Sequence, residues 1–225
     1  GLKNRPVRWV MLAAPFTGGV GVYAFYALQP YLLELYGDPN AYSIAGLAAA
    51  IFAGAQIAGG YAAPRVRLLF KKRTTSLILG SVVSAAILVV LGLISSFWFA
   101  LGLLVIWGLI YSAVFPIRQA YLNDMIPSKQ RATVLSFDSL MSSSGGVVVQ
   151  PILGRVADVY SYATSFVISG AIELLAVPFL VASRRERAPA DEATGTPAPS
   201  PPGSSPRSWP RPGSTRRLGP GAALP

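Results

Sequence analysis

Acidic side chains inside long apolar stretches are the groups of this sequence best placed to do chemistry. Asp138 lies seven residues after Arg131, which is about 10 Å further along a helix. A carboxylate at that depth in a bilayer is costly unless it faces protein, water or a partner. Asp138 could therefore carry a proton or contact a cationic substrate. It could equally bond a neighbouring hydroxyl such as that of Ser142, which lies on the same helical face.

A polar segment between two apolar stretches carries charges that could latch one helix to the next. Arg118 and Asp124 lie near the end of the first stretch, Pro127 breaks the chain, and Lys129 and Arg131 precede the second stretch. An acidic helix end that faces basic residues gains energy at a partly dehydrated interface, and such a pair can break when helices rock. The alternative is that the basic residues only anchor the topology. Both interpretations can hold together.

The residue types that are missing exclude most enzyme classes. The 225 residues contain no His and no Cys. This excludes a Ser-His-Asp triad, a thiol nucleophile, iron–sulfur ligands and the usual zinc sites, whereas carboxylate sites for hard cations stay possible. An intramembrane aspartyl protease needs two converging aspartates within spans, and only Asp138 qualifies. There is also no Walker sequence for ATP. We therefore predict no enzyme, no metal and no cofactor.

The elements that must position these residues are membrane helices. Hydrophobic residues make up 52% of the chain and charged residues 12%, and the mean hydropathy is +0.50. A bilayer core needs about 20 helical residues per crossing, and continuous apolar runs leave no polar face for water. We predict an all-α membrane protein with six transmembrane helices, at about residues 9–35, 43–63, 75–94, 97–115, 133–153 and 164–182.

The basic residues predict how these helices are oriented. The net charge of +10 is spread between the apolar runs instead of along one face, which argues against a nucleic-acid partner. Across alternating loops, 14 Lys and Arg residues fall on one side and only Arg155 on the other. Basic loops stay in the cytoplasm. We therefore predict a multi-pass protein of the cell membrane, surrounded by lipid, with both ends of its membrane unit in the cytoplasm.

The chain divides into three parts by composition. Residues 1–8 form a basic lead-in, residues 9–183 the six-helix bundle, and residues 184–225 a tail rich in Pro, Gly, Ser and Arg that we expect to be disordered. The tail is a flexible extension, the frameshifted end of a GC-rich reading frame, or a tether to anionic lipid. Because the chain begins with Gly1, we expect a fragment or a processed product.

Several short motifs resemble one family of membrane proteins. An acidic helix end at Asp124 is followed by Ile126-Pro127 and Arg131-Ala132. The next apolar stretch contains Gly145-Gly146, Gln150-Pro151 and Gly154, and Arg155 to Asp158 precede the last stretch. Together with Gln29-Pro30-Tyr31 near the end of the first stretch, this pattern is similar to that of the major facilitator superfamily of secondary transporters. The resemblance covers roughly residues 5–185.

The resemblance implies an architecture and a function. Six helices with both ends in the cytoplasm are one half of the family's twelve-helix fold, and the lead-in resembles the end of its central linker, so the chain would be the C-terminal half. Such transporters bind a small-molecule substrate between two six-helix halves near the membrane middle. We expect transport by alternating access, with proton-coupled export as one form, and an N-terminal half or a second copy as partner. The alternative is a non-transporting, truncated or half-size protein that acts through assembly.

The resemblance also implies which residues form the gate. The family's signature loop usually has Gly, three residues, Asp and Arg. Here Gly60 is followed by Tyr61-Ala62-Ala63, and Pro64 stands at the acidic position before Arg65. The loop keeps its positive charge but lacks the acidic part of the latch. We expect the cytoplasmic gating group to comprise Arg65, Arg73, Arg118, Asp124 and Arg131.

The resemblance finally implies a substrate path along the first, second, fourth and fifth helices. We expect it to be lined by Tyr23, Tyr26, Gln29, Gln56, Trp107 and Tyr111, with Asp138. The tyrosines at 23 and 26 share a helical face, as do Trp107 and Tyr111, and aromatic faces bind flat apolar or cationic molecules. The alternative is that these aromatics fill helix contacts. Glu173 lies in the last helix, which is peripheral in the family, and Glu34 can reach the interface, so we expect structural roles for both.

Overall fold

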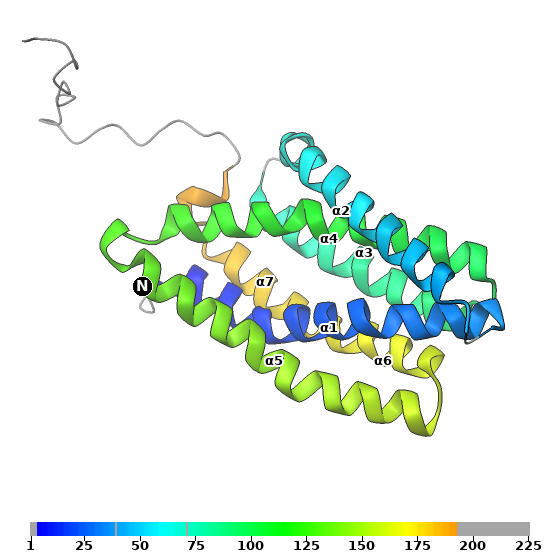
Figure 1. Ribbon diagram of the computed structural model, residues 1–225. Helices are drawn as coiled ribbons and strands as arrows, with labels where there is room; N and C mark the ends of the chain where they lie inside the picture. The colour runs from blue at the N-terminus through cyan, green and yellow to red at the C-terminus, as the bar shows by residue number, and fades with distance from the viewer. Residues whose placement is uncertain (1–3, 39, 71, 193–225) are drawn as a thin grey trace, which may run out of the picture. The chain divides into compact units, whose positions relative to one another are not determined.

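The computed structural model describes residues 4–38, 40–70 and 72–192. It confirms the predicted fold class: six helical segments are long and apolar enough to cross a membrane (Figure 1), the sixth being formed by α6 and α7 together. The α-helices are α1 Arg5–Tyr36, α2 Tyr42–Leu69, α3 Arg73–Leu93, α4 Phe97–Met125, α5 Arg131–Val159, α6 Tyr162–Leu174 and α7 Ala176–Arg185; the 3-10 turns are η1 Ser128–Gln130 and η2 Pro189–Asp191.

Most helices are longer than the apolar stretches that predicted them. The largest difference is in α4, which was expected to end at residue 115 and continues to Met125. Hydropathy marks only the part of a helix that meets lipid, whereas backbone hydrogen bonding continues through polar residues at the interface. Arg118 and Asp124 therefore lie within a helix instead of in a loop. Similarly, α1 begins at Arg5, inside the predicted lead-in.

The last span is interrupted at Leu175, between α6 and α7. Pro178 lies three residues later, and its ring removes the backbone donor that would reach the carbonyl of Leu174. The Leu175 amide instead donates to the Ile172 carbonyl at 3.0 Å, which is the tighter spacing of a 3-10 turn. The regular α-helical hydrogen-bond pattern is therefore interrupted at this point.

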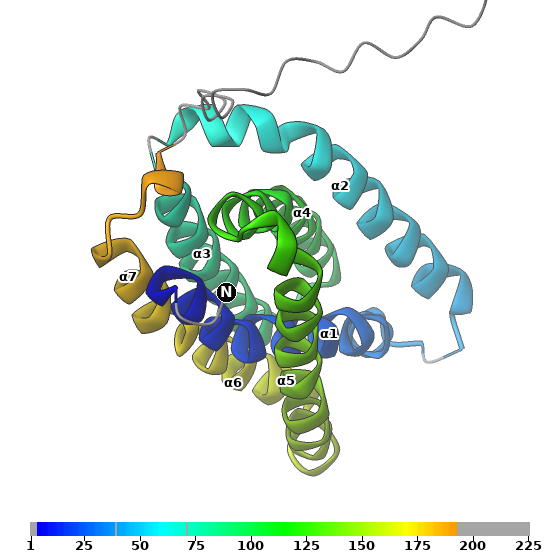
Figure 2. The same ribbon diagram turned by 90° about the vertical axis from the view of Figure 1, so that its left-hand side faces the viewer.

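The helices pack mainly in three pairs, α1 with α5, α2 with α4, and α3 with α6 (Figure 2). Small residues permit the closest crossing, since helices in lipid associate by close packing and not by the hydrophobic effect. At Gly145 on α5, an added Cβ would collide with the backbone of Pro15 on α1. Gly19 on α1 faces Gly145 in turn, with its would-be Cβ 2.7 Å from the Gly145 carbonyl.

One end of the bundle gathers the start of α1, the end of α4, the start of α5 and the end of α7 (Figure 1). We call this the basic end, because Arg5, Lys129, Arg131 and Arg184 lie there. Polar contacts tie the segments together: the Asn4 amide donates to the Met125 carbonyl at 3.2 Å, and the Ser183 hydroxyl donates to the Pro6 carbonyl at 3.1 Å. The basic end is thus a packed part of the bundle.

Residues 184–192 were predicted to belong to the disordered tail, and this prediction was wrong for them. α7 continues to Arg185, and the turn that follows packs against the start of α3. The buried carboxylate of Asp191 accepts hydrogen bonds from the Thr74 amide and the Thr74 hydroxyl, both at 2.8 Å. These bonds satisfy donors that a helix start leaves free. The remainder of the predicted tail, residues 193–225, lies outside the described residues.

The α1–α5 crossing gives a prediction for stability. Gly145→Ala is expected to lower the free energy of unfolding by about 1–3 kcal/mol, because the added methyl must push α1 and α5 apart. The matched control is Gly154→Ala on the same helix, where a Cβ would meet nothing within 4 Å. Thermal unfolding in detergent measures both variants. Equal melting temperatures for the two would contradict the close crossing.

Candidate functional site

The predicted path residues lie largely in one pocket between α1, α2 and α4. We call it the aromatic pocket. Its volume is about 210 Å³, and its lining is Gly21, Val22, Phe25, Tyr26, Phe52, Gln56, Trp107 and Tyr111. Four of the seven predicted path residues are among them. Phe52 stacks on Trp107 with ring centroids 5.5 Å apart and an angle of 17°, and Trp107 lies 5.7 Å from Tyr111.

The other predicted path residues lie elsewhere. Tyr23 does not share the face of Tyr26: Tyr23 is 6% exposed and Tyr26 is 65% exposed. The Tyr23 hydroxyl donates to Ser165 on α6 at 2.6 Å, so this side chain fills an interior helix contact. The reason is that three residues advance a helix by about 300°, which leaves 60° between the two side chains. Gln29 is half-buried and does not line the aromatic pocket.

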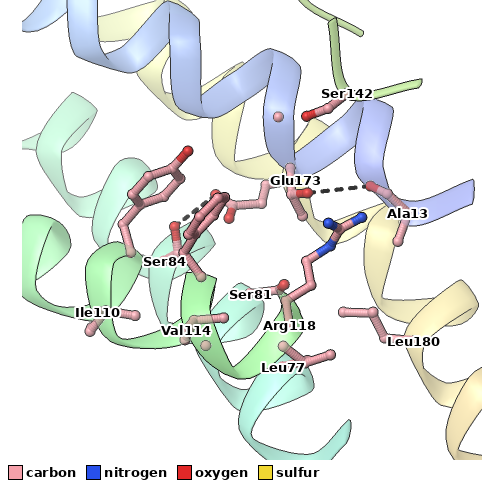
Figure 3. Close-up of a pocket in the computed structure, with 15 residues that line it drawn as sticks. Ala13, Leu77, Ser81, Ser84, Ile110, Val114, Arg118, Ser142, Glu173 and Leu180 are labelled. Atoms are coloured by element: carbon pink, nitrogen blue, oxygen red, sulfur yellow. Dashed lines mark hydrogen bonds between the residues drawn. The ribbon is translucent and has the colours of Figure 1, made fainter. Parts of the chain in front are cut away.

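A second pocket lies deeper in the bundle, behind Tyr111, which lines both pockets. We call it the inner pocket. Its volume is about 100 Å³, which is room for several water molecules. Its polar lining groups are the hydroxyls of Thr17, Ser81, Ser84, Tyr111 and Ser142, together with Arg118 and Glu173 (Figure 3).

A hydrogen-bond chain joins the two pockets. The Trp107 indole N–H donates to the Ser84 hydroxyl at 2.8 Å, and that hydroxyl donates to Oε2 of Glu173 at 2.9 Å. These hydrogen bonds run from α4 through α3 to α6, so Glu173 on the last span is connected through Ser84 to Trp107 in the wall of the aromatic pocket. Sequence reasoning noticed Glu173 but missed Phe52 and Ser84. Phe52 and Gln56 are four residues apart on one face, which is the signal that could have identified Phe52.

Asp138 is paired with Arg118, a partner that was not predicted for it. The two carboxylate oxygens accept from the two terminal guanidinium nitrogens at 2.6 and 2.7 Å, a bidentate geometry. Asp138 is 3% exposed. The alternative bond to Ser142 is not made; the Ser142 hydroxyl instead faces Gly18 on α1. Arg118 was expected in the cytoplasmic gating group, and it lies instead in the interior as part of this ion pair.

Asp124 also has a partner other than the expected one. Its carboxylate accepts from Arg73, at the start of α3, at 2.6 Å, instead of pairing with Lys129 or Arg131. The Arg73 side chain is 5% exposed and that of Asp124 is 54% exposed. This pair joins α3 to α4 at the basic end, directly beside the Thr74 cap. Arg65 and Arg131 are exposed, and neither forms an ion pair within the part of the chain that the structure describes.

Metal ligands do not gather in the described ranges, where no group of three or more acidic side chains is placed to hold an ion. The site is therefore an arrangement of aromatic rings, hydroxyls and one interior ion pair. It can bind a molecule by stacking and hydrogen bonding, and it can hold charge inside the membrane.

The arrangement is that of a helical membrane protein with a binding pocket among its spans. A sequence model of the Major Facilitator Superfamily matches residues 69–216, well over half of the chain. The chain belongs to this superfamily, whose members are membrane transporters. No curated protein and no solved structure gives a significant match.

The interior ion pair gives a second prediction. Asp138→Asn and Arg118→Gln are each expected to lower the free energy of unfolding by about 3–5 kcal/mol, because each leaves an uncompensated buried charge. The double variant should cost clearly less than the sum of the two. Glu34→Gln is the control, since this exposed carboxyl group forms no ion pair among the described residues and its loss should change the free energy of unfolding by about 0.5 kcal/mol or less. Additive costs in the double-mutant cycle would contradict the ion pair.

Proposed function

We propose that this chain moves a small molecule across the membrane by alternating access, as one six-helix half of a secondary transporter. The observation that supports this most directly is the aromatic pocket, which α1, α2 and α4 build from side chains far apart in sequence. In the superfamily, these are helices that face the central path. A pocket in that position can be reached from the region between two halves.

The lining of the aromatic pocket suggests the class of substrate. Among the described residues, its lining contains five aromatic side chains, the amide of Gln56, and no charged side chain. Rings bind flat apolar molecules by stacking and organic cations by their π faces. The amide can donate and accept one oriented hydrogen bond. We infer a flat aromatic or aromatic-cationic substrate of drug-like size, and export as the direction.

The gate in this proposal is at the basic end. Arg73 and Asp124 hold α3 against α4 there, and in the interior Arg118 holds α4 to α5. Rocking of the helices toward the opposite state must loosen these pairs. Opening the Arg73–Asp124 pair should cost less free energy than opening the Arg118–Asp138 pair, because the Asp124 carboxylate is half-exposed and that of Asp138 is buried. We place this end in the cytoplasm, by the predicted 14-to-1 distribution of basic residues.

The partner is a second six-helix bundle that covers the pocket-bearing face. Large apolar side chains of α2 and α5 are strongly exposed, among them Ile57, Tyr61, Leu140 and Val147. Lipid can cover such residues, but a lipid-covered face would leave the aromatic pocket without an aqueous route. The same exposed face favours the alternative function, a non-transporting protein that acts through assembly. We therefore treat assembly and transport as separate tests.

Assembly can be tested by cysteine cross-linking, because the natural chain contains no Cys. Val147→Cys on α5 is expected to cross-link in the source membrane, to another half or to a second copy. Leu79→Cys is the matched control. Leu79 is also exposed, but it lies on α3, which we expect to face lipid, so this variant should stay monomeric. Gel mobility after labelling with a benzophenone maleimide and irradiation gives the readout, because this reagent links one thiol to any neighbouring chain. Cross-linking at neither position, or equally at both, would contradict a partner on this face.

Transport can be tested with ethidium, a flat aromatic cation. Tyr26→Ala is expected to raise KM for ethidium flux about three- to tenfold in proteoliposomes, since one stacked ring contributes about 0.5–1.5 kcal/mol. Tyr26 is exposed, so its loss should not disturb folding. Tyr42→Ala, an exposed tyrosine outside the pocket, should leave KM unchanged. The protein is purified from its source membrane with any partner half. Flux that is absent while the cross-link forms would favour the assembly function.

A further inference from the structure

Glu173 is an acidic side chain inside the bundle that has no basic partner among the described residues. It is 7% exposed, and its Oε2 accepts one bond, from the neutral hydroxyl of Ser84. Within the described residues no Lys or Arg nitrogen lies within 4 Å of its carboxyl group. Figure 3 shows the Ser84 bond and the Arg118 side chain, which lines the same pocket. A buried carboxylate needs either a cation or a proton to offset the loss of water.

The charges around the inner pocket do not balance unless one proton is bound. α4 contributes Tyr111 and Arg118, α5 contributes Asp138 through its pair with Arg118, and α1, α3 and α7 contribute only hydroxyl or apolar side chains. The pocket and its surroundings therefore hold two carboxyl groups, of Asp138 and Glu173, and only one guanidinium, that of Arg118. With Asp138 holding Arg118 in a bidentate pair, an ionised Glu173 would leave one uncompensated negative charge in the interior. One proton makes the cluster neutral.

The position of Glu173 connects this proton to the aromatic pocket. The Trp107 ring stacks on Phe52 in the aromatic pocket, and its N–H is bonded to Ser84, which is bonded to Glu173. A molecule that inserts against Trp107 must act on this hydrogen-bond chain. A change in the charge of Glu173 must in turn alter the environment of the indole.

We propose that Glu173 is a proton-binding site, and that its protonation is coupled to occupation of the aromatic pocket. Proton binding converts the carboxylate to the neutral acid while Ser84 keeps donating to Oε2. Release of the proton leaves a carboxylate across the inner pocket from Arg118, where it competes with Asp138 for the guanidinium. Deprotonation thereby loosens the tether between α4 and α5. The coupling part rests on the proposed function, whereas the proton site itself does not.

Trp107 supplies a built-in reporter of this proton. In the background Trp9→Phe, Trp98→Phe, Trp209→Phe, the fluorescence of the purified chain comes from Trp107 alone. We expect it to change with pH through a single one-proton transition. Glu173→Gln, whose amide oxygen can still accept from Ser84, should abolish the transition and keep the helical circular dichroism. Glu34→Gln, an exposed carboxyl far from the pocket, should leave it unchanged.

Two further variants exclude other titrating groups. Tyr111→Phe removes the hydroxyl that lines both pockets and should keep the transition. Asp138→Asn leaves the Arg118 charge uncompensated on the wall of the same pocket, which favours the ionised form of Glu173 and should move the midpoint to lower pH. No transition in the parent, or one that persists in Glu173→Gln, would overturn the proton site.

Flux then separates the proton site from the proposed function. Glu173→Gln is expected to lose ethidium accumulation driven by a pH gradient, yet to retain ethidium exchange between the two faces, because exchange needs no net proton movement. Accumulation that is undiminished in this variant would overturn the coupling. If neither protein moves ethidium but the Trp107 titration stands, the transport proposal fails and the proton site survives.

Discussion

The ion pair between Arg118 and Asp138 is the constraint on which the interior of this bundle depends. Neither charge can lie in the membrane alone, because an isolated buried charge costs several kcal/mol. α4 and α5 make few direct backbone contacts with each other, and the two hydrogen bonds of this pair join their side chains directly. The pair also fixes the guanidinium in the wall of the inner pocket. An ion pair held by two hydrogen bonds can open and close again, whereas two closely packed helix faces resist gradual separation.

The two pockets divide the chemistry between them. The outer one has rings and an amide and no charge; the inner one has hydroxyls, a guanidinium and a carboxyl group. Trp107 and Tyr111 form the wall between them. A hydrogen-bond chain passes through that wall, and it is the route by which we propose that binding in one pocket is coupled to charge in the other. In the proposed function, such a site would bind an organic ligand by shape and stacking and would hold a proton on the protein side of the wall.

The sequence predicted the spans well, because hydrophobicity and loop charge act locally. It predicted the partners of charged residues poorly, because those partners are distant. Asp124 pairs with Arg73, 51 residues away, and not with the nearby Lys129. Tyr23 and Tyr26 show the same limit: helical spacing brings two side chains near each other, but only the neighbouring helices decide which one is buried. Glu173 was assigned a peripheral place by resemblance, whereas packing of α3 against α6 brings it to the inner pocket.

The basic end contains a carboxylate although the signature loop lacks one. Pro64 stands where the superfamily usually has Asp, so α2 supplies no carboxylate there. The carboxylate comes instead from Asp124 at the end of α4, and it engages Arg73 in the first turn of α3. The backbone N–H groups of that first turn have no partner within the helix and need acceptors from elsewhere. Asp191, which follows the last span, satisfies one of them at the next residue. The segment after the sixth span thus holds the helix start that carries the arginine, and any motion that opens the Arg73–Asp124 pair must also shift or strain this cap.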